Sequence, residues 1–371
     1  MTFENWRSEF LLKCTNKGVS AAVLKLILPY LVPLPSVLNA DSTQSEARKT
    51  LQDYISLTVS EKRIVEGRDA LVLHASTFEK IEVEYSVDRY VVAAIWGLES
   101  NYGTVRGDVP VLSALATLAA QGRRRAMFEA QIFAALEIIG QGIKAPNQLR
   151  GSWAGAMGHT QFMPKSYLDF AVSAHEEQPD IWSNDPADAL VSSANFLTCH
   201  GWRPDCPWGL QVHVPENSNF YDLRHLPAQD GSGWAALGLR GAGLMDATWL
   251  SKLVLPGGVH SAAFLVSRNF KALLRYNASP TYAIAVGHLA DRFRGGSPLD
   301  FSNGADQHGL SFSEIQFIQT QLTFLGFDTK GADGFTGPNT EVAIEAFQIA
   351  SGLPVDGFAG LSLLARLQNK S

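Results

Sequence analysis

The stretch DRYVVAAIWGLESNYG, residues 88–103, contains the clearest helical pattern in the chain. Its apolar side chains share one face at helical spacing: Val91, Ile95, Leu98 and Tyr102. Gly103 follows at the position where a helix is expected to end. Similar periodicity dominates residues 44–143, so we predict a mainly α fold of the α+β class.

Glu99 lies in the last turn of this predicted helix. Helical side chains lean back toward the preceding turn, which places the apolar Trp96 and Ile95 beside Glu99, and no basic residue lies within reach along the helix. Apolar neighbours and the negative end of the helix dipole both disfavour a charged carboxylate. We therefore predict a raised pKa for Glu99, which suits an acid that protonates the leaving oxygen of a glycosidic bond.

The sequence around Glu99 resembles that of the membrane-bound lytic transglycosylase B family. Four ordered motifs carry the resemblance: ESNYG and VPVLSALATL at residues 99–103 and 109–118, GSWAGAMGHTQFMPKSY at 151–167, GW at 201–202, and SRNFKALLRYNASP at 267–280. The resemblance covers roughly residues 5–295, and it implies a lysozyme-like core with a helical N-terminal region. Residues 202–255, rich in Gly, Pro and Trp, predict a small β-containing insertion.

The resemblance implies cleavage of peptidoglycan without water. Glu99 would protonate the oxygen between N-acetylmuramic acid and N-acetylglucosamine, and then, as a base, withdraw the proton of the muramoyl C6 hydroxyl to leave a 1,6-anhydromuramoyl end. Asp108 is the nearest rival carboxylate, and its place before a Pro-containing turn favours a structural role. Two alternatives stay open: a lysozyme-type hydrolase, which needs a second carboxylate, and an inert wall-binding protein.

Several residues match substrate-binding positions of the family. Ser152 matches a serine that holds the substrate N-acetyl group or C6 hydroxyl, and Gln161 matches a glutamine that lines the groove. A turn role for Ser152 and a loop hydrogen bond for Gln161 are the structural alternatives. The remaining matches lie at the floor and edge of the cleft: Tyr276, Asn277 and Tyr282.

A basic run follows the next predicted helix. Within Arg123–Arg125, the residues Arg124 and Arg125 match a family pair that meets the acidic stem peptide, although a solvated charge run is the ordinary alternative. Phe128 and Phe196 stand where some relatives have groove tyrosines, so two hydroxyl contacts are expected to be missing.

A calcium loop found in some relatives has no counterpart in this sequence. Residues 173–182 read SAHEEQPDIW, which lacks both the glycine of a sharp turn and alternating oxygen ligands. We predict no metal and no cofactor.

Residues 311–368 resemble a three-helix peptidoglycan-binding domain. The pattern DGFTG at residues 333–337 recurs as DGFAG at 356–360, which indicates a duplicated turn and helix. Helical spacing predicts a small core from Leu322, Leu325, Ile344 and Phe347. We expect a catalytic domain at 1–295, a linker at 296–310 and the binding domain at 311–371.

Bulk properties limit the partners. A net charge of −6 gives no general attraction to nucleic acid. The family resemblance implies glycan strands and stem peptides as ligands, and we expect a monomeric chain. Residues 20–38 are apolar but contain Lys25 and three prolines, so they cannot form a transmembrane helix. The family resemblance also implies the periplasm of a Gram-negative bacterium, and we expect that the signal peptide is absent from this chain. A bridge between Cys199 and Cys206 stays open.

Overall fold

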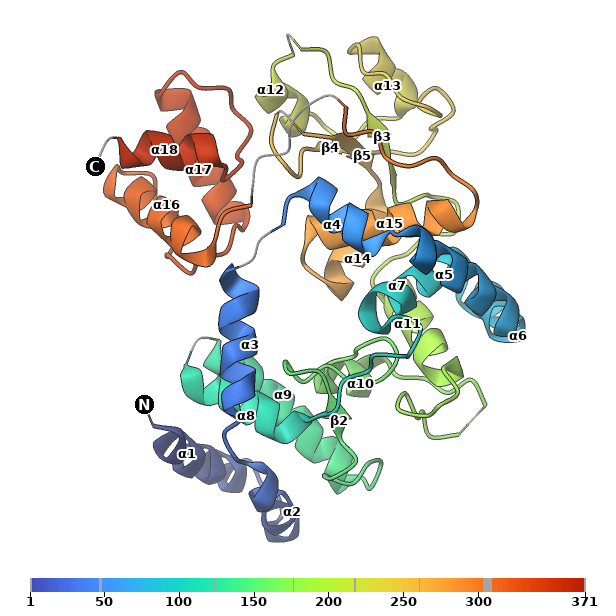
Figure 1. The fold of residues 1–371 in the computed structure, drawn as a ribbon, viewed down its shortest axis with the longest axis vertical. Coiled ribbons are helices and arrows are strands. Elements are labelled where there is room, and N and C mark those ends of the chain that lie inside the picture. The colour runs from blue at the N-terminus through green and yellow to red at the C-terminus, as the bar shows by residue number, and fades with distance from the viewer. Residues whose placement is uncertain are drawn as a thin grey trace. The chain divides into compact units, whose positions relative to one another are not determined.

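The computed structural model describes residues 2–46, 49–122, 124–175, 177–216, 218–259, 261–302 and 309–369. Helices dominate it, and the only sheets among the described residues have two and three strands (Figure 1). The mainly α, α+β prediction is therefore confirmed. The chain forms two compact units: Met1–Thr43 with Lys62–Cys199, and Gln44–Glu61 with His200–Ser371.

The first unit is almost entirely helical. Its elements are α1 Phe3–Asn16, α2 Ala21–Ile27, η1 Leu28–Tyr30, α3 Pro35–Glu46, α5 Glu61–Leu73, α6 Ala75–Lys80, η2 Ile81–Tyr85, α7 Arg89–Ser100, β1 Val109–Pro110, α8 Val111–Gln121, α9 Arg125–Gly140, β2 Arg150–Gly151, α10 Pro164–Phe170 and α11 Ala187–Cys199. The side chains of residues 111–119 are all buried, because α8 packs between α1 and α9. Such all-round burial explains why residues 111–119 are apolar except for Ser113 and Thr117.

The apolar segment at residues 20–38 forms two short helices and a turn rather than one long helix. Pro29 lies in the turn η1, and Ile27, Leu31 and Val37 are fully buried. Among the described residues, no single helix is long and apolar enough to cross a membrane; only the pair 21–30 and 35–41, bent by 74°, meets that test jointly.

Helix α7 begins and ends as its sequence dictates. The Asp88 side chain accepts the Tyr90 N–H at 2.9 Å and caps the start. The helix ends at Ser100, and residues 101–103 take left-handed conformations, with φ of 49°, 55° and 82°. The predicted stop is therefore a three-residue turn that begins at Asn101, a residue type that tolerates this conformation, and finishes on Gly103.

The second unit contains a three-stranded antiparallel sheet of order β3-β5-β4. Its elements before the C-terminal helices are α4 Leu51–Thr58, β3 Gly209–Val212, α12 Phe220–His225, α13 Gly231–Ala236, β4 Lys252–Val254, β5 Ala263–Val266, α14 Arg268–Tyr276 and α15 Pro280–Phe293. The central strand β5 follows the predicted β region at 202–255, so that region was drawn too short. An uninterrupted run of four buried apolar residues explains the omission, because it lacks the alternation that marks a half-buried strand.

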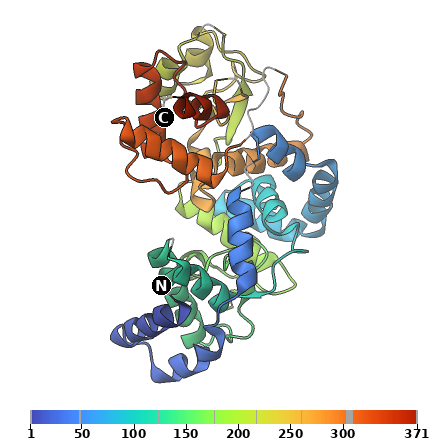
Figure 2. The same cartoon turned by 60° about the vertical axis from the view of Figure 1, so that its left-hand side comes forward.

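Three helices close the second unit. They are α16 Phe312–Phe324, α17 Pro338–Ala350 and α18 Leu361–Gln368, drawn in orange to red and gathered around one another in Figures 1 and 2. Leu322, Ile344 and Phe347 are buried in their shared core, as predicted. Leu325 is 37% exposed, so its core assignment is wrong: it is the C-cap of α16, where the helical spacing no longer applies.

Candidate active site

Glu99 is half-buried in the last turn of α7. The seven residues before Leu98, from Val91 to Gly97, are buried, so this helix is rigidly held by packing up to the turn that carries the carboxyl group. The first unit therefore presents Glu99 at the end of a buried helix, beside the left-handed turn at residues 101–103.

One hydrogen-bond network fixes the end of α7 to the loop at residues 151–162. Trp96 Nε1 donates to His159 Nδ1 at 3.2 Å, and Ser100 Oγ donates to the His159 carbonyl at 2.5 Å. The same Ser100 Oγ accepts the Gly103 N–H at 2.9 Å. The residues on both sides of Glu99 are thus tied to the loop that carries Ser152 and Gln161.

His159 is neutral in this network. Because Nδ1 accepts from Trp96, the proton lies on Nε2, which donates to the Ser183 carbonyl at 2.8 Å. Burial lowers the pKa of His159 below its usual range, and the charge of Arg106 acts in the same direction. Arg106 reaches past the ring to the carbonyls of Trp182 and Ser183 at 3.0 and 2.7 Å.

Gly103 permits the close approach of this loop. Its φ of 82° favours glycine, and an added Cβ would overlap the His159 ring. The glycine that the sequence marked as a helix stop is therefore also a packing requirement of the site.

Ser152 follows the short strand β2, which pairs with β1. Its Oγ accepts the Ala156 N–H at 3.1 Å, so the turn role considered from the sequence is present. Among the described residues the Ser152 hydroxyl hydrogen has no acceptor, which leaves one donor for a ligand. Gly107 approaches this turn so closely that a Cβ there would overlap the Gly151 carbonyl.

Gln161 also combines a structural contact with unused capacity. Its Nε2 donates to the Arg106 carbonyl at 3.0 Å and to the Gly158 carbonyl at 2.9 Å. Within the described ranges its Oε1 has no hydrogen-bond partner, so it remains an acceptor for a ligand hydroxyl. The fixed amide hydrogens determine which way this oxygen points.

The basic run lies at the start of α9. Arg125 donates to Glu129 and Glu9, each at 2.7 Å, while Arg124 lies over the Phe128 ring at 5.4 Å. Arg123 lies outside the described residues. The Arg125 guanidinium thus joins α9 to α1, and a contact of either arginine with a stem peptide stays a prediction.

Phe128 and Phe196 are both buried, at 4% and 6% exposure. Phe196 packs against Phe162 and Phe170, with ring centroids 5.9 and 4.9 Å away. The phenylalanines therefore support the helices around the site through apolar packing, and their predicted place in a sugar-binding groove stays untested.

The other predicted site residues belong to the second unit. Asn277 ends α14, and its Oδ1 accepts the Ser279 N–H at 3.1 Å in the turn that leads into α15. Tyr282 is buried in the first turn of α15, and Tyr276 is the last residue of α14. All three are therefore concentrated at one helix junction.

The segment that replaces the calcium loop is held by protein groups. Both Asp188 oxygens accept backbone N–H groups, those of Ala174 and Asp180, each at 2.7 Å. Asp180 itself pairs with Lys144 at 3.0 Å. These carboxylates do not fit a calcium site, and the described residues contain no cluster of three or more His, Cys, Asp or Glu side chains suited to a metal.

Sequence reasoning missed Trp96, Ser100, Arg106 and His159 as organisers of the site. His159 stands inside one of the quoted motifs, but nothing in the sequence pairs it with a helix 63 residues earlier. The three cysteines are free thiols, so Cys199 and Cys206 are not bridged.

The chain resembles solved structures in both sequence and fold. SltB3 from Pseudomonas aeruginosa, solved in complex with NAG-anhNAM-pentapeptide, is 37% identical with a TM-score of 0.86, over 99% of this chain and 100% of that one. Escherichia coli lytic transglycosylase Slt35, solved with calcium, is 28% identical with a TM-score of 0.65, over 77% and 92% of the two chains.

A curated relative is the membrane-bound lytic murein transglycosylase B of Escherichia coli strain K12, 35% identical over 213 residues. That alignment covers 55% of this chain and 56% of the relative, so the match spans little more than half of its length. Residues 313–367 match the putative peptidoglycan binding domain family. Residues 2–291 match the transglycosylase SLT domain, and the chain belongs to that family.

Proposed function

We propose that this chain is a lytic transglycosylase of peptidoglycan, with Glu99 as its single acid and base. It cleaves the β-1,4 bond between N-acetylmuramic acid and N-acetylglucosamine. Family membership supports the reaction class, and the solved complex of the similar SltB3 with NAG-anhNAM-pentapeptide supports an anhydro product.

Glu99 acts twice in one turnover. Its carboxylic acid first gives a proton to the glycosidic oxygen as the C1–O bond breaks and N-acetylglucosamine departs. The resulting carboxylate then takes the proton of the muramoyl C6 hydroxyl while O6 forms a bond to C1. The 1,6-anhydro ring closes, Glu99 regains its proton, and no water is consumed.

The observation that carries the proposal is the attachment of α7 to the loop at residues 151–162. Trp96 and Ser100 flank Glu99 and both bond to His159, so the helix turn that carries Glu99 is tied to a loop that offers two unused groups. Ser152 supplies a hydroxyl donor and Gln161 an amide acceptor for the N-acetyl group and the C6 hydroxyl. Preorganised groups of this kind lower the barrier because they need no rearrangement during reaction.

Three carboxylates of the first unit have partners of their own, which favours a mechanism with one carboxylate over hydrolysis. Asp108 is 88% exposed and pairs with Arg150 at 3.1 Å. Asp188 is occupied by backbone N–H groups and Asp180 by Lys144. An ordinary glycosidase would require a second carboxylate beside the scissile bond as nucleophile or base.

The remaining substrate contacts are proposed from the family pattern. Arg124 and Arg125 meet the acidic stem peptide, while Tyr276, Asn277 and Tyr282 line the glycan site from the α14–α15 junction. Phe128 and Phe196 border the site without hydroxyl groups. Each assignment is supported by its matched motif position.

The proposed wall substrate supports a location in the bacterial envelope, and we propose the periplasm of a Gram-negative cell. We also propose a monomer whose domains, at residues 1–295 and 311–371, are joined by a linker at 296–310. The family matches at 2–291 and 313–367 support this division. Cell fractionation against a periplasmic marker tests the location, and recovery in the cytoplasm would contradict it. Light scattering tests the oligomeric state, and the mass of a dimer would contradict the monomer.

Mass spectrometry of digested sacculi tests the proposed reaction. The expected fragments end in 1,6-anhydromuramic acid, 18 Da lighter than hydrolysed ends by the mass of one water. Fragments that are all reducible by borohydride would show hydrolysis and refute the proposal.

A further inference from the structure

The duplicated DGF pattern forms the same hydrogen-bonded turn twice. In the first copy, Gln319 of α16 donates through Nε2 to Asp333 Oδ1 at 3.0 Å and accepts the Gly334 N–H at 2.8 Å. Asp333 Oδ1 also accepts the Phe335 N–H at 3.0 Å. One helix glutamine therefore holds the whole turn.

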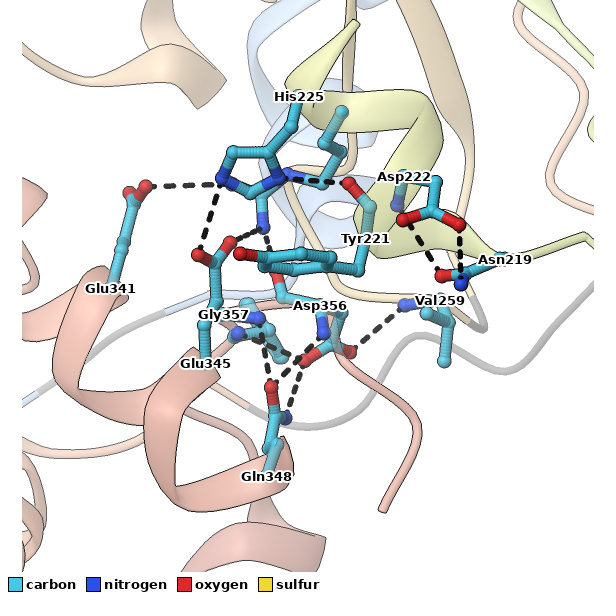
Figure 3. Close-up of polar contacts among 12 residues, drawn as sticks. Asn219, Tyr221, Asp222, His225, Val259, Glu341, Glu345, Gln348, Asp356 and Gly357 are labelled. Carbon is cyan, nitrogen blue, oxygen red and sulfur yellow. Dashed lines mark hydrogen bonds and ion pairs between the residues drawn. The ribbon is translucent and has the colours of Figure 1, made fainter. Parts of the chain in front are cut away.

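The second copy repeats these bonds with Gln348 of α17. Gln348 Nε2 donates to Asp356 Oδ1 at 2.7 Å, and its Oε1 accepts the Gly357 N–H at 3.0 Å (Figure 3). Asp356 Oδ1 accepts the Phe358 N–H at 2.9 Å. Gly334 and Gly357 both have positive φ, 75° and 67°. The two turns are thus equivalent in structure as well as in sequence.

The second turn is occupied by another part of the same unit. Asp356 Oδ2 accepts the Val259 N–H at 3.1 Å (Figure 3). The Asp356 carbonyl accepts a bond from Arg224 of α12. Arg224 also pairs with Glu345 at 2.9 Å. This contact shows which groups the outer face of the turn recognises: a backbone amide N–H and a cation.

The first turn offers the same acceptors to solvent. Asp333 is exposed, and in the described part of the chain neither its Oδ2 nor its carbonyl oxygen has a hydrogen-bond partner. It lines a surface pocket of about 150 Å³ together with Thr329, Lys330, Gly337, Asn339 and Thr340. Ligand pockets usually hold roughly 300–1,000 Å³, so this pocket suits part of a ligand rather than a whole disaccharide.

We propose that this pocket binds the peptide stem of peptidoglycan. An amide N–H of the stem occupies the place that Val259 takes on the second turn, and the ammonium group of a diamino acid occupies the place of Arg224. The inference rests on the proposed function for the identity of the polymer.

Charge favours the stem over the glycan strand. The pocket is lined by Asp333 and Lys330, so its rim presents both signs of charge. Among the residues that the structure describes, Lys330 forms an ion pair with Asp328 alone, at 2.6 Å and exposed to solvent. A stem peptide bears carboxylates and an ammonium group, whereas the sugars themselves are uncharged. Glu345 lies three residues before Gln348 in the second copy, and the equivalent residue in the first copy is Gln316. Because Gln316 carries no charge, the first copy should bind a cation less tightly than the second.

Two substitutions in the full chain test the pocket, both made with Glu99→Gln so that the wall is bound without turnover. Asp333→Asn keeps an Oδ1 for the internal bonds and replaces the outward acceptor with a donor. Gly337→Ser adds a side chain at the pocket wall, where the backbone is extended, a Cβ meets open space, and serine is a favoured N-cap. Glu341→Gln, which removes one negative charge on α17 away from the pocket, is the matched control.

The measurement is binding of these chains to intact sacculi and to sacculi whose stem peptides have been removed with an amidase. We expect Asp333→Asn and Gly337→Ser to weaken binding to intact sacculi about tenfold, the effect of one lost charge-assisted hydrogen bond. The control should bind like the parent, and the two losses should disappear on the stripped sacculi.

Unchanged binding of both pocket variants to intact sacculi would overturn the inference. An equal loss on stripped sacculi would also overturn it, because the pocket would then bind glycan. Neither result affects the product test of the proposed function, since binding here is measured without turnover.

Discussion

Trp96 Nε1 donates a hydrogen bond to His159 Nδ1 at 3.2 Å and so joins the helix of Glu99 to the loop of Ser152 and Gln161. The partners are 63 residues apart in sequence, and their rings also meet edge to face at 5.8 Å. The position of the carboxyl group therefore depends on a contact between two segments that the chain brings together only when it folds.

Trp96→Phe tests this contact. The buried His159 Nδ1 would lose its donor, so we expect a loss of about 1–2 kcal/mol in the free energy of unfolding and a fall in kcat larger than the change in KM. Trp182→Phe is the matched control, because the Trp182 indole nitrogen has no hydrogen-bond partner among the described residues. Equal losses in urea unfolding for the two variants would show that ring packing, not the bond, holds the site.

Gly103→Ala tests the close approach of the loop. The new Cβ would meet the His159 ring at a positive φ, so we expect at least about 2 kcal/mol of destabilisation. Gly122→Ala, at φ 92° with open space around its Cβ, should cost about 1 kcal/mol from backbone strain alone. Thermal or urea unfolding that ranks the two variants equally contradicts the role of Gly103.

These features show how far the sequence alone can lead. The spacing in residues 88–103 predicted the α7 helix and placed Glu99 in its last turn, because local periodicity and a glycine stop are properties of neighbouring residues. The partnership of Trp96 with His159 could not be predicted in this way, since it depends on tertiary packing. The same limit applies to Arg224, whose partner Glu345 lies 121 residues later.

Core positions could be predicted from the sequence inside regular helices but not at helix ends. Ile344 and Phe347 were placed correctly because they lie within a regular helix, whereas Leu325 lies at a helix end where spacing no longer determines direction. Ser152 and Gln161 each form a structural hydrogen bond and keep one polar group unused. The structural role and the substrate-binding role considered from the sequence are therefore compatible. Only the structure showed that the Ser152 hydroxyl hydrogen and Gln161 Oε1 are unused within the described residues.

Burial of His288 predicts a loss of stability in acid. Its pKa is lowered to about 4, by burial and then by Arg292, whereas the unfolded chain has a value near 6.5. Protons therefore bind the unfolded state first, and its contribution is complete above pH 6.5 and is lost as the pH falls from 6.5 toward 4. The lowered value corresponds to roughly 3 kcal/mol across this window.

His288→Gln removes this dependence, and His175→Gln, at an exposed position, is its control. Asp291 on the same helix acts in the opposite direction, because burial raises its pKa to about 6 and its contribution is lost as pH rises toward 6. The Asp291 contribution is the same in the unaltered chain, in His288→Gln and in His175→Gln. We expect urea unfolding at pH 7.5, 6 and 4.5 to show a smaller fall in the free energy of unfolding toward acid pH for His288→Gln alone. The same pH dependence in all three chains would contradict the assignment.

Arg224→Ala should loosen the second DGF turn. The Glu345 side chain, 9% exposed, would lose its closest cation, and the Asp356 carbonyl would lose a donor, so we expect about 2 kcal/mol of destabilisation. Hydrogen exchange of the Gly357 amide should accelerate. Arg203→Ala is the control, since Arg203 is 56% exposed in a pair at 3.8 Å, and equal exchange in both variants would show that Arg224 does not hold the turn.

The central claim is that Glu99 alone performs both proton transfers, and the most direct measurement is the rate of anhydromuropeptide release by Glu99→Gln. Glutamine keeps the size of the side chain but can neither give nor take the proton, so we expect at least a 10³-fold fall in rate with sacculus binding retained. Asp108→Asn, which removes the exposed carboxylate paired with Arg150, should release the product at the unaltered rate. Release by Glu99→Gln at the rate of the unaltered chain, or a comparable loss in Asp108→Asn, would contradict the account.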